Sequence, residues 1–466
     1  GALALRAKPS LRVKEAELRE AAAKADQALL AFIPRLSGTA TYTRLSEVQN
    51  SLGTQTVFGL ATGDPANPFS TSIPTGGLVN GACPAPAPSS LSCVHVFEPS
   101  GKDAGTLSVT QVGFNFPVLL NSYSLAAQLA IPVSDYVLRL SHFYAAATHG
   151  ETAKKYDLQA AELQAVAEAK VSFYNWIRAK GASVVAAEAL NQADAHLQDV
   201  KRIVDAGLAS KGDLLRLEAQ KAAAEQFAAD AAAVANVSEQ ALRISLGLPA
   251  DKPLSIGTDV LHEAPGSEGT TLEALEKEAL GKRLELRSIT ESERATTSLV
   301  SGARAQYLPR VDAFAGATYA NPNQRIFPQR DEFRFTWEAG VRMSWTVNDT
   351  LAAPAAVSEA KARAAQITAL KEQLLQGLRL EVASTYGDLK RAEATIDAAD
   401  RGLIAAEETL RVQTELFRAG RATSVAIVDA ETALVQARLQ RVNARVGVLI
   451  AKTRLEHAAG RDVPGT

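Results

Sequence analysis

Residues that could carry out chemistry are few in this chain, and they are scattered. None of the six histidines stands in a His-Glu-x-x-His pattern, and no Gly-x-Ser-x-Gly or phosphate-binding Gly-x-x-x-x-Gly-Lys loop occurs. His142 and His149 are spaced to share one face of a helix and could in principle bind a metal, but no acid or thiol completes the set. A packed or solvated pair is the favoured interpretation. The sequence therefore predicts no enzyme, no cofactor and no metal site.

Cysteine chemistry is limited to Cys83 and Cys93, which lie in a stretch rich in Pro, Ser and Gly. No cluster of histidines and cysteines accompanies them, so a metal site is disfavoured. We predict a small loop closed by a disulfide between them, as in proteins of oxidising compartments. The alternative is two unpaired thiols in a mobile loop.

Composition narrows the class of protein. The formal net charge is −2, from 49 Lys+Arg and 51 Asp+Glu, so no excess of base is available for nucleic acid. Hydrophobic residues make up 47% and aromatic residues only 6%, and Ala dominates the apolar content, which suits helices that approach closely. No apolar run approaches the roughly 18–20 residues of a membrane-spanning helix. Residues 1–10 contain no signal-peptide apolar region and resemble the entry to a helix, as in a mature or trimmed product.

The elements that organise this chain form an internal repeat. Each copy has a Pro-Arg pair where a helical pattern becomes alternating, an aspartate where it becomes helical again, and an Ala-Gly turn further on. These are Pro34-Arg35, Asp135 and Ala206-Gly207, then Pro309-Arg310, Asp349 and Ala419-Gly420. We predict copies at 1–247 and 271–466 joined by a Pro/Gly-rich linker at 248–270. An insertion at 46–108, on the extracellular side, holds both cysteines.

Each copy contributes two predicted strands with a strict period of two. From 335 to 347 apolar residues alternate with polar ones that include Glu338 and Arg342, and 124–133 matches this pattern. An alternating strand of about 10 residues, apolar toward lipid and polar toward the interior, is typical of a transmembrane barrel. The residues predicted to face lipid are Leu125, Leu129, Ile131, Trp337, Val341 and Trp345. The two tryptophans would lie near opposite membrane interfaces. The alternative is a soluble β-sandwich edge.

Long helices follow the strands. We predict uninterrupted helices over 135–206 and 350–418, with apolar residues at heptad spacing, and shorter return helices over 212–247 and 423–460. A further helix is predicted over 271–306. We expect 212–247 to stack end to end with 271–306, and 423–460 with 10–33. Four strands per chain cannot close a barrel, so several chains must contribute.

Taken together, the duplicated Pro-Arg entries, the aspartate junctions and the two Ala-Gly turns resemble the TolC-type outer-membrane efflux proteins. The resemblance covers nearly the whole chain. It implies a mixed α/β membrane protein: a trimeric 12-stranded β-barrel, four strands per chain, on a long α-helical coiled-coil barrel. It further implies the outer membrane of a Gram-negative bacterium, with the helices in the periplasm and outer-membrane lipid around the barrel. The expected function is a passive duct of a tripartite efflux or type I secretion system. Its expected partners are a periplasmic adaptor protein and an inner-membrane pump.

The same resemblance implies a gate at the periplasmic end. Asp429 matches one acidic position of the family's constriction, but the other falls on Ala426. Asp213 matches the acidic partner of a link between hairpins, whose basic position falls on Ala422 with Arg421 beside it. We therefore expect a link between Asp213 and Arg421. The alternative is a solvated surface contact worth under about 1 kcal/mol.

The two helical turns match the tips that meet the adaptor in the family. Gly207, Leu208, Gly420 and Arg421 are the residues expected to contact it, since small residues let another hairpin approach closely. A second class of function stays open, a periplasmic structural or adaptor coiled-coil protein that never enters lipid.

Overall fold

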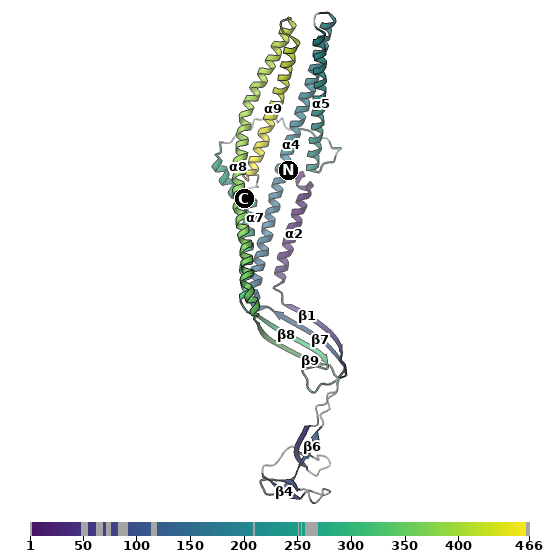
Figure 1. Ribbon diagram of the computed structural model, residues 1–466, viewed down its shortest axis with the longest axis vertical. Coiled ribbons are helices and arrows are strands. Elements are labelled where there is room, and N and C mark those ends of the chain that lie inside the picture. The colour runs from purple at the N-terminus through teal and green to yellow at the C-terminus, as the bar shows by residue number, and fades with distance from the viewer. Residues whose placement is uncertain are drawn as a thin grey trace. The chain divides into compact units, whose positions relative to one another are not determined.

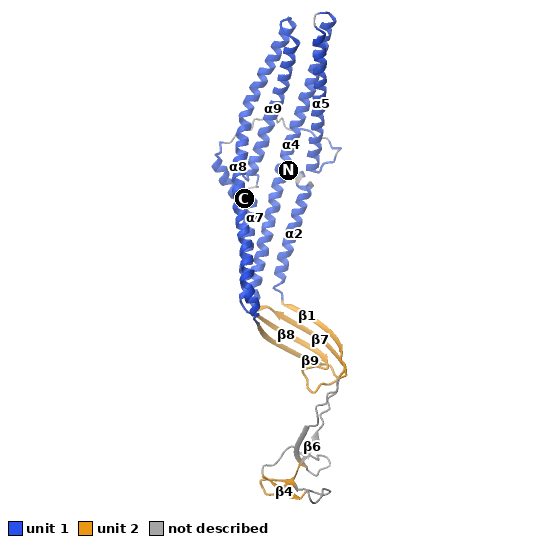
Figure 2. Cartoon of the chain, viewed as in Figure 1, with its two compact units in different colours: residues 1–33, 134–310, 344–466 blue, residues 34–133, 311–343 orange. Residues whose placement is uncertain are grey.

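The computed structural model describes residues 2–47, 55–61, 69–70, 76–82, 92–112, 119–207, 210–249, 251–252, 254–256 and 269–462. The chain divides into two compact units (Figure 2). The first, residues 1–33, 134–310 and 344–466, is helical. The second, residues 34–133 and 311–343, is built of strands.

The helical unit contains two long helices, each followed by a shorter return helix (Figure 1). Its elements are α1 (Ala2–Ala7), α2 (Pro9–Leu30), α3 (Val133–Asp135), a π-helical turn η1 (Tyr136–Leu140), α4 (Ser141–Asp205), α5 (Lys211–Leu246), α6 (Leu272–Lys282), α7 (Leu284–Arg304), a 3₁₀ turn η2 (Ala305–Tyr307), α8 (Val347–Arg418) and α9 (Ser424–Ala458). At about 1.5 Å per residue, the 65 residues of α4 extend roughly 100 Å. None of the described helices is both long and apolar enough to cross a membrane.

Small residues at heptad spacing hold these helices together. On α4 the buried set includes residues seven apart, and the same spacing recurs on α9: Ala179, Ala186, Ala193 and Val200, then Ala430, Ala437, Ala444, Ala451 and Ala458. A seven-residue repeat keeps one seam facing its neighbours. Because most of these side chains are single methyl groups, the helix axes can approach closely. Larger residues form local clusters, one of which groups Trp176 and Ile177 with Leu242, Val446 and Ile450.

One predicted helix is broken in the structure. The stretch 271–306 forms α6 and α7, separated by Arg283, whose backbone is extended at φ −61° and ψ 124°. The break places the guanidinium, 9% exposed, between Glu285 and Glu381, with the carbonyl oxygens of His457 and Ala458 also within hydrogen-bond distance. These partners come largely from α8 and α9, which explains why local sequence does not show the break.

The expected end-to-end stacking of the short helices is wrong. Helix α9 contacts α4 and α8, the same two neighbours as α7, and Arg461 just beyond α9 pairs with Glu278 of α6 at 3.0 Å. Helix α5 contacts α4, as α2 does, and α1 contacts α5. The stacked pairs are therefore α9 with α6–α7 and α5 with α1–α2. Periodicity identifies each helix but carries no information on which helix continues which.

The strand unit has two sheets. Strands β1 (Arg35–Arg44), β7 (Asn121–Ile131), β8 (Arg310–Asn321) and β9 (Arg334–Ser344) form a four-stranded sheet in the order β1-β7-β8-β9. The β1–β7 and β7–β8 pairs are antiparallel, and their register places Leu129 beside Leu36 and Ala315. The insertion contributes β2 (Gln55–Ala61), β3 (Phe69–Ser70), β4 (Gly77–Ala82), β5 (Ser92–Phe97) and β6 (Asp103–Val112) to a five-stranded sheet in the order β3-β2-β6-β5-β4. The described residues of the insertion thus form strands of a sheet where the sequence predicted only a loop.

Candidate functional site

The four-stranded sheet has one apolar and one mostly polar face. Side chains alternate across a strand, so the register assigns the odd-numbered residues of β7 and β8 to one face and the even-numbered ones to the other. Leu125, Leu129 and Ile131 share the odd face of β7, and Leu125 is 59% exposed. On β9, Trp337 and Val341 are 69% and 71% exposed. Large apolar side chains on a sheet with so much exposure need a covering of lipid or protein.

An aromatic cluster lies at one end of this sheet, and the sequence analysis did not single it out. Tyr123 of β7 lies 5.0 Å from Tyr42 of β1 and 6.1 Å from Phe333, between ring centroids, and Phe333 stacks on Tyr319 of β8 at 5.1 Å. Aromatic rings with exposed edges are enriched where a barrel meets the membrane interface. The signal was present, since Tyr42 and Tyr319 occupy matching places in the two copies.

Trp345 is not a strand residue, contrary to the prediction. Strand β9 ends at Ser344 and α8 begins at Val347, so Trp345 lies in the connection. Its indole N–H donates to the Thr350 hydroxyl at 2.9 Å. The alternating pattern of the sequence thus extends past the end of the strand and into the first residue of the helix.

The polar face holds the charged residues that the sequence placed in the barrel interior. The carboxylate of Glu338 pairs with Arg325, and the guanidinium of Arg342 lies 4.9 Å above the ring of Phe314. Glu338 therefore pairs with Arg325, and Arg342 contacts Phe314, instead of pairing with each other. A small cleft of about 300 Å³ on this face is lined by Ser124, Thr318 and Glu338, among others.

The two helical turns share one geometry. Gly207 has φ +78° and Gly420 has φ +70°, the left-handed conformation that ends a helix most readily at glycine. The Gly420 N–H donates to the Phe417 carbonyl at 2.9 Å, and the Arg421 N–H donates to that of Leu416 at 2.8 Å. A Cβ on either glycine would meet open space. Leu208, the fourth residue expected at these tips, lies outside the described residues.

Asp213 has a local role that the sequence analysis missed. It is the third residue of α5, and its carboxylate accepts from the Ser210 backbone N–H at 3.4 Å while the Ser210 Oγ accepts from the Asp213 N–H at 3.1 Å. This reciprocal arrangement is a capping box. Arg421 and Asp429 are exposed. The link between Asp213 and Arg421, and the place of Asp429 in a constriction, stay predictions.

A groove lies between the two hairpins, α4–α5 and α8–α9, close to their turns. It has a volume of about 930 Å³, and we call it the tip groove. The residues that line it include Gln192, His196, Asp199, Arg202, Asp213, Phe417, Arg418, Thr423 and Glu431. Within it, His196 of α4 is 8% exposed, its Nδ1 is 3.4 Å from Glu431 of α9, and its ring packs edge-on against Phe417 of α8. Sequence reasoning treated His196 as one scattered histidine, because its neighbours are far along the chain.

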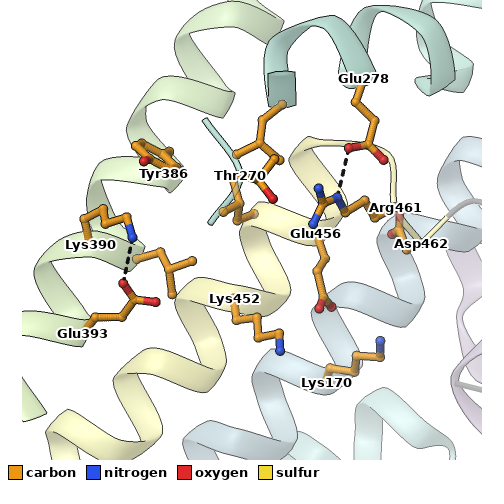
Figure 3. Close-up of a pocket in the computed structure, with 13 residues that line it drawn as sticks. Lys170, Thr270, Glu278, Tyr386, Lys390, Glu393, Lys452, Glu456, Arg461 and Asp462 are labelled. Atoms are coloured by element: carbon orange, nitrogen blue, oxygen red, sulfur yellow. Dashed lines mark hydrogen bonds and ion pairs between the residues drawn. The ribbon is translucent and has the colours of Figure 1, made fainter. Parts of the chain in front are cut away.

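A second cleft of about 460 Å³ lies among α4, α6, α8 and α9 (Figure 3). Lys170 and Lys452 extend toward the same space as Glu456, while Lys390 pairs with Glu393 and Arg461 with Glu278. Acids and bases are balanced here, so the cleft favours no charged ligand. Across the described part of the chain, no group of three or more His, Cys, Asp or Glu side chains is placed to hold a metal ion.

The inserted module contains a histidine held on both sides. His95 Nδ1 lies 2.8 Å from the Asp103 carboxylate and Nε2 lies 3.0 Å from the Ala82 carbonyl. The bond to Ala82 and then that to Asp103 raise the pKa of His95 above its usual value. Cys93 on β5 is disulfide-bonded, while Cys83 lies outside the described residues, so their pairing stays a prediction.

Comparison with known proteins agrees with this architecture. Residues 275–461 match the family model described as outer membrane efflux protein. The fold is similar to that of CusC, described as forming a transmembrane channel (TM-score 0.73, 16% identity, covering 98% of this chain and 90% of that one). It is also similar to the Vibrio cholerae outer membrane protein VceC (TM-score 0.71, 18% identity, covering 98% of this chain and 94% of that one). A further similar fold is the Neisseria gonorrhoeae MtrE outer membrane channel (TM-score 0.72, 15% identity, covering 98% of this chain and 87% of that one). No curated protein sequence matches the chain.

Long helical hairpins and a four-stranded sheet make up the fold that this chain shares with these outer-membrane proteins. The family match and the shared fold confirm the resemblance to the TolC-type outer-membrane efflux proteins and, with it, the predicted fold class. The family match covers residues 275–461 of the chain, and the solved structures share the fold of almost all of it. The family match and the shared fold support the role of an outer-membrane efflux channel.

Proposed function

We propose that the chain is one protomer of a homotrimeric, passive export duct of the Gram-negative outer membrane. In this proposal three four-stranded sheets close a 12-stranded barrel and the helices line a periplasmic tunnel. The duct receives substrates from an inner-membrane pump through a periplasmic adaptor, in a tripartite efflux or type I secretion system. Its partners are two further copies of itself, the adaptor, the pump and the lipid around the barrel.

The observation that carries this proposal is the four-stranded sheet. Its outer strands β1 and β9 each pair with one neighbour in the sheet, so each has an open edge. An open edge is not tolerated in lipid, because unpaired N–H and C=O groups cost several kcal/mol each. Exposed Leu125, Trp337 and Val341 nevertheless suit a lipid face. Closure by identical copies resolves the conflict, because β1 of one copy can pair with β9 of the next.

The competing function, a periplasmic coiled-coil adaptor outside lipid, explains the helices equally well. It gives no reason for the exposed apolar residues on the sheet or for the aromatic cluster at its end. The match to an outer membrane efflux family also favours the duct.

Two substitutions on one strand test the proposal. Leu125 and Gln128 lie on opposite faces of β7, and both are exposed. We expect Leu125→Arg to cost about 2–4 kcal/mol at mid-membrane and to deplete the trimer from the outer-membrane fraction. Gln128→Arg places the same charge in the aqueous interior and should leave the trimer intact. Equal tolerance of both, in a protein that is monomeric and soluble without detergent, would refute the duct.

For the helical end, we propose that Gly207, Leu208, Gly420 and Arg421 contact the adaptor, and that Asp213, Arg421 and Asp429 contribute to closure. Open space beside both glycines supports close approach of a partner hairpin. A photo-crosslinking residue at Arg421, in the turn after α8, should capture the adaptor in cells. One at the exposed Lys361, near the opposite end of α8, should not.

A further inference from the structure

The tip groove contains an incompletely satisfied histidine. Both ring nitrogens of His196 are buried, and neither has a hydrogen-bond partner among the residues that the structure describes. The nearest ionisable group is the Glu431 carboxylate, 13% exposed, at 3.4 Å from Nδ1 without the alignment of a hydrogen bond. A buried polar group left without a partner costs about 1–3 kcal/mol, so this position needs a reason.

The other charged side chains around His196 already have ion-pair or hydrogen-bond partners. On α4, Asp199 pairs with Arg202; on α8, Arg418 pairs with Glu415 at 3.2 Å. Asp213 of α5 belongs to the capping box with Ser210. Glu431 of α9 is thus the acid in the groove that can complement a proton on His196.

This contact joins two hairpins. His196 lies on α4 and Glu431 on α9, whereas neighbouring ion pairs stay within one hairpin: Lys221 joins Asp194 at 2.6 Å across α5 and α4, and Arg445 joins Asp400 at 2.5 Å across α9 and α8. A change of charge at His196 therefore acts on the contact between hairpins.

We propose that His196 and Glu431 form a proton-operated clamp that holds the two hairpins together at acidic pH. Imidazole is the side chain that ordinarily gains its charge between pH 8 and 5. When His196 is neutral, the ring fills space beside Glu431 without bonding it. When it is protonated, both nitrogens become donors, and a small rotation gives a charge-assisted hydrogen bond to the carboxylate. The clamp narrows the periplasmic end as pH falls, which deepens the proposed function and rests on it.

The experiment is single-channel recording of the detergent-purified trimer in planar bilayers between pH 8 and 5.5. In the wild type the ratio of closed to open dwell times should rise about tenfold on acidification, the size of one charge-assisted hydrogen bond. His196→Gln and Glu431→Gln should each abolish most of this rise. His149→Gln is the matched control, because His149 also lies on α4 and contacts a glutamate, Glu291 of α7, at 2.7 Å; it should retain the rise.

Each outcome separates the two proposals. A trimer that conducts with the same pH dependence in the wild type and both groove variants overturns the clamp and leaves the duct standing. A chain that inserts no channel at any pH overturns the duct itself. Far-ultraviolet circular dichroism and trimer retention on gel filtration show whether a variant has folded, and Glu431→Gln, which keeps the side-chain volume, provides a second route if His196→Gln fails to assemble.

Discussion

Arg283 offers the sharpest test of how the helical unit is held together. Its guanidinium donates to both carboxylate oxygens of Glu285 at 3.0 Å and to Glu381 of α8 at 3.2 Å. It also lies within 3.3 and 3.4 Å of the carbonyl oxygens of His457 and Ala458 at the end of α9. Burial lowers the pKa of Arg283, but the bonds and charges of Glu285 and Glu381 outweigh it and raise that pKa. One side chain thus ties the α6–α7 break to two other helices.

The perturbation is Arg283→Met, which keeps much of the side-chain length and removes the charge. Two carboxylates and two carbonyl oxygens then lose a donor in a site where the arginine is only 9% exposed. Removing one partner of a buried ion pair costs about 3–5 kcal/mol. We take the lower end, about 3 kcal/mol, because Glu381 is 40% exposed and recovers water. Arg283→Lys should be destabilised less than Arg283→Met, because its ammonium group keeps the charge but cannot form the planar, two-pronged hydrogen bonds of a guanidinium.

Hydrogen–deuterium exchange of the trimer in detergent measures this locally. A loss of about 3 kcal/mol corresponds to amide exchange about 100-fold faster, since each 1.4 kcal/mol is a factor of ten. The effect should be confined to peptides covering 279–286 and 455–459. Arg287→Ala is the control, because that guanidinium makes only a 3.5 Å contact with the Gly281 carbonyl. If Arg283→Met changes the exchange rates of these amides no more than Arg287→Ala does, the buried network around Arg283 does not hold the α6–α7 break against α8 and α9.

Two further predictions concern the same helices. The bonds from Lys371 and Thr368 lower the pKa of Glu293, so the α7–α8 contact adds stability above the pKa of an unfolded glutamate, about 4.3, and this stability is lost as the pH falls through the lower folded value. We expect Glu293→Gln to weaken the dependence of the melting temperature on pH below about pH 4.5. An unchanged pH dependence would exclude this linkage. Asp213→Ala removes the capping box and should lower the stability of the start of α5 by about 0.5–2 kcal/mol. If the predicted link to Arg421 exists, Asp213→Ala and Arg421→Ala should both raise the single-channel conductance. Unchanged conductance in both variants would rule out the link but not the capping box.

Features encoded by local periodicity were predictable from the sequence. The heptad positions Ala193 and Val200 are buried, and Gly207 and Gly420 end their helices in the left-handed conformation. These succeed because a helix face and a C-cap depend on residues a few positions apart. The break at Arg283 was not predictable, since its partners come from α8 and from the end of α9. The stacking order of the short helices and the fold of the insertion depend likewise on contacts between distant segments.

The candidate site shows the same division. The apolar face of β7 and β9 follows from the alternation of apolar and polar residues alone. Trp345 was assigned to the strand wrongly, because an apolar residue that continues the alternation can lie beyond the end of the strand. At the helical end, resemblance directed attention to Asp429 and Arg421, which are exposed and whose ion pairs would be screened to under about 1 kcal/mol.

The buried contact at the tips has the stronger physical case for closure. A charge that appears on a buried side chain acts through a lower local dielectric than water, so the proposed protonation of His196 beside Glu431 would change the free energy of the contact between hairpins more than an exposed pair can. The three side chains that define this contact, His196, Phe417 and Glu431, come from three helices. Substitution of the expected second acid by Ala426 then has a simple consequence. With less charge at the expected constriction, the proposed clamp between α4 and α9 would carry a larger share of closure.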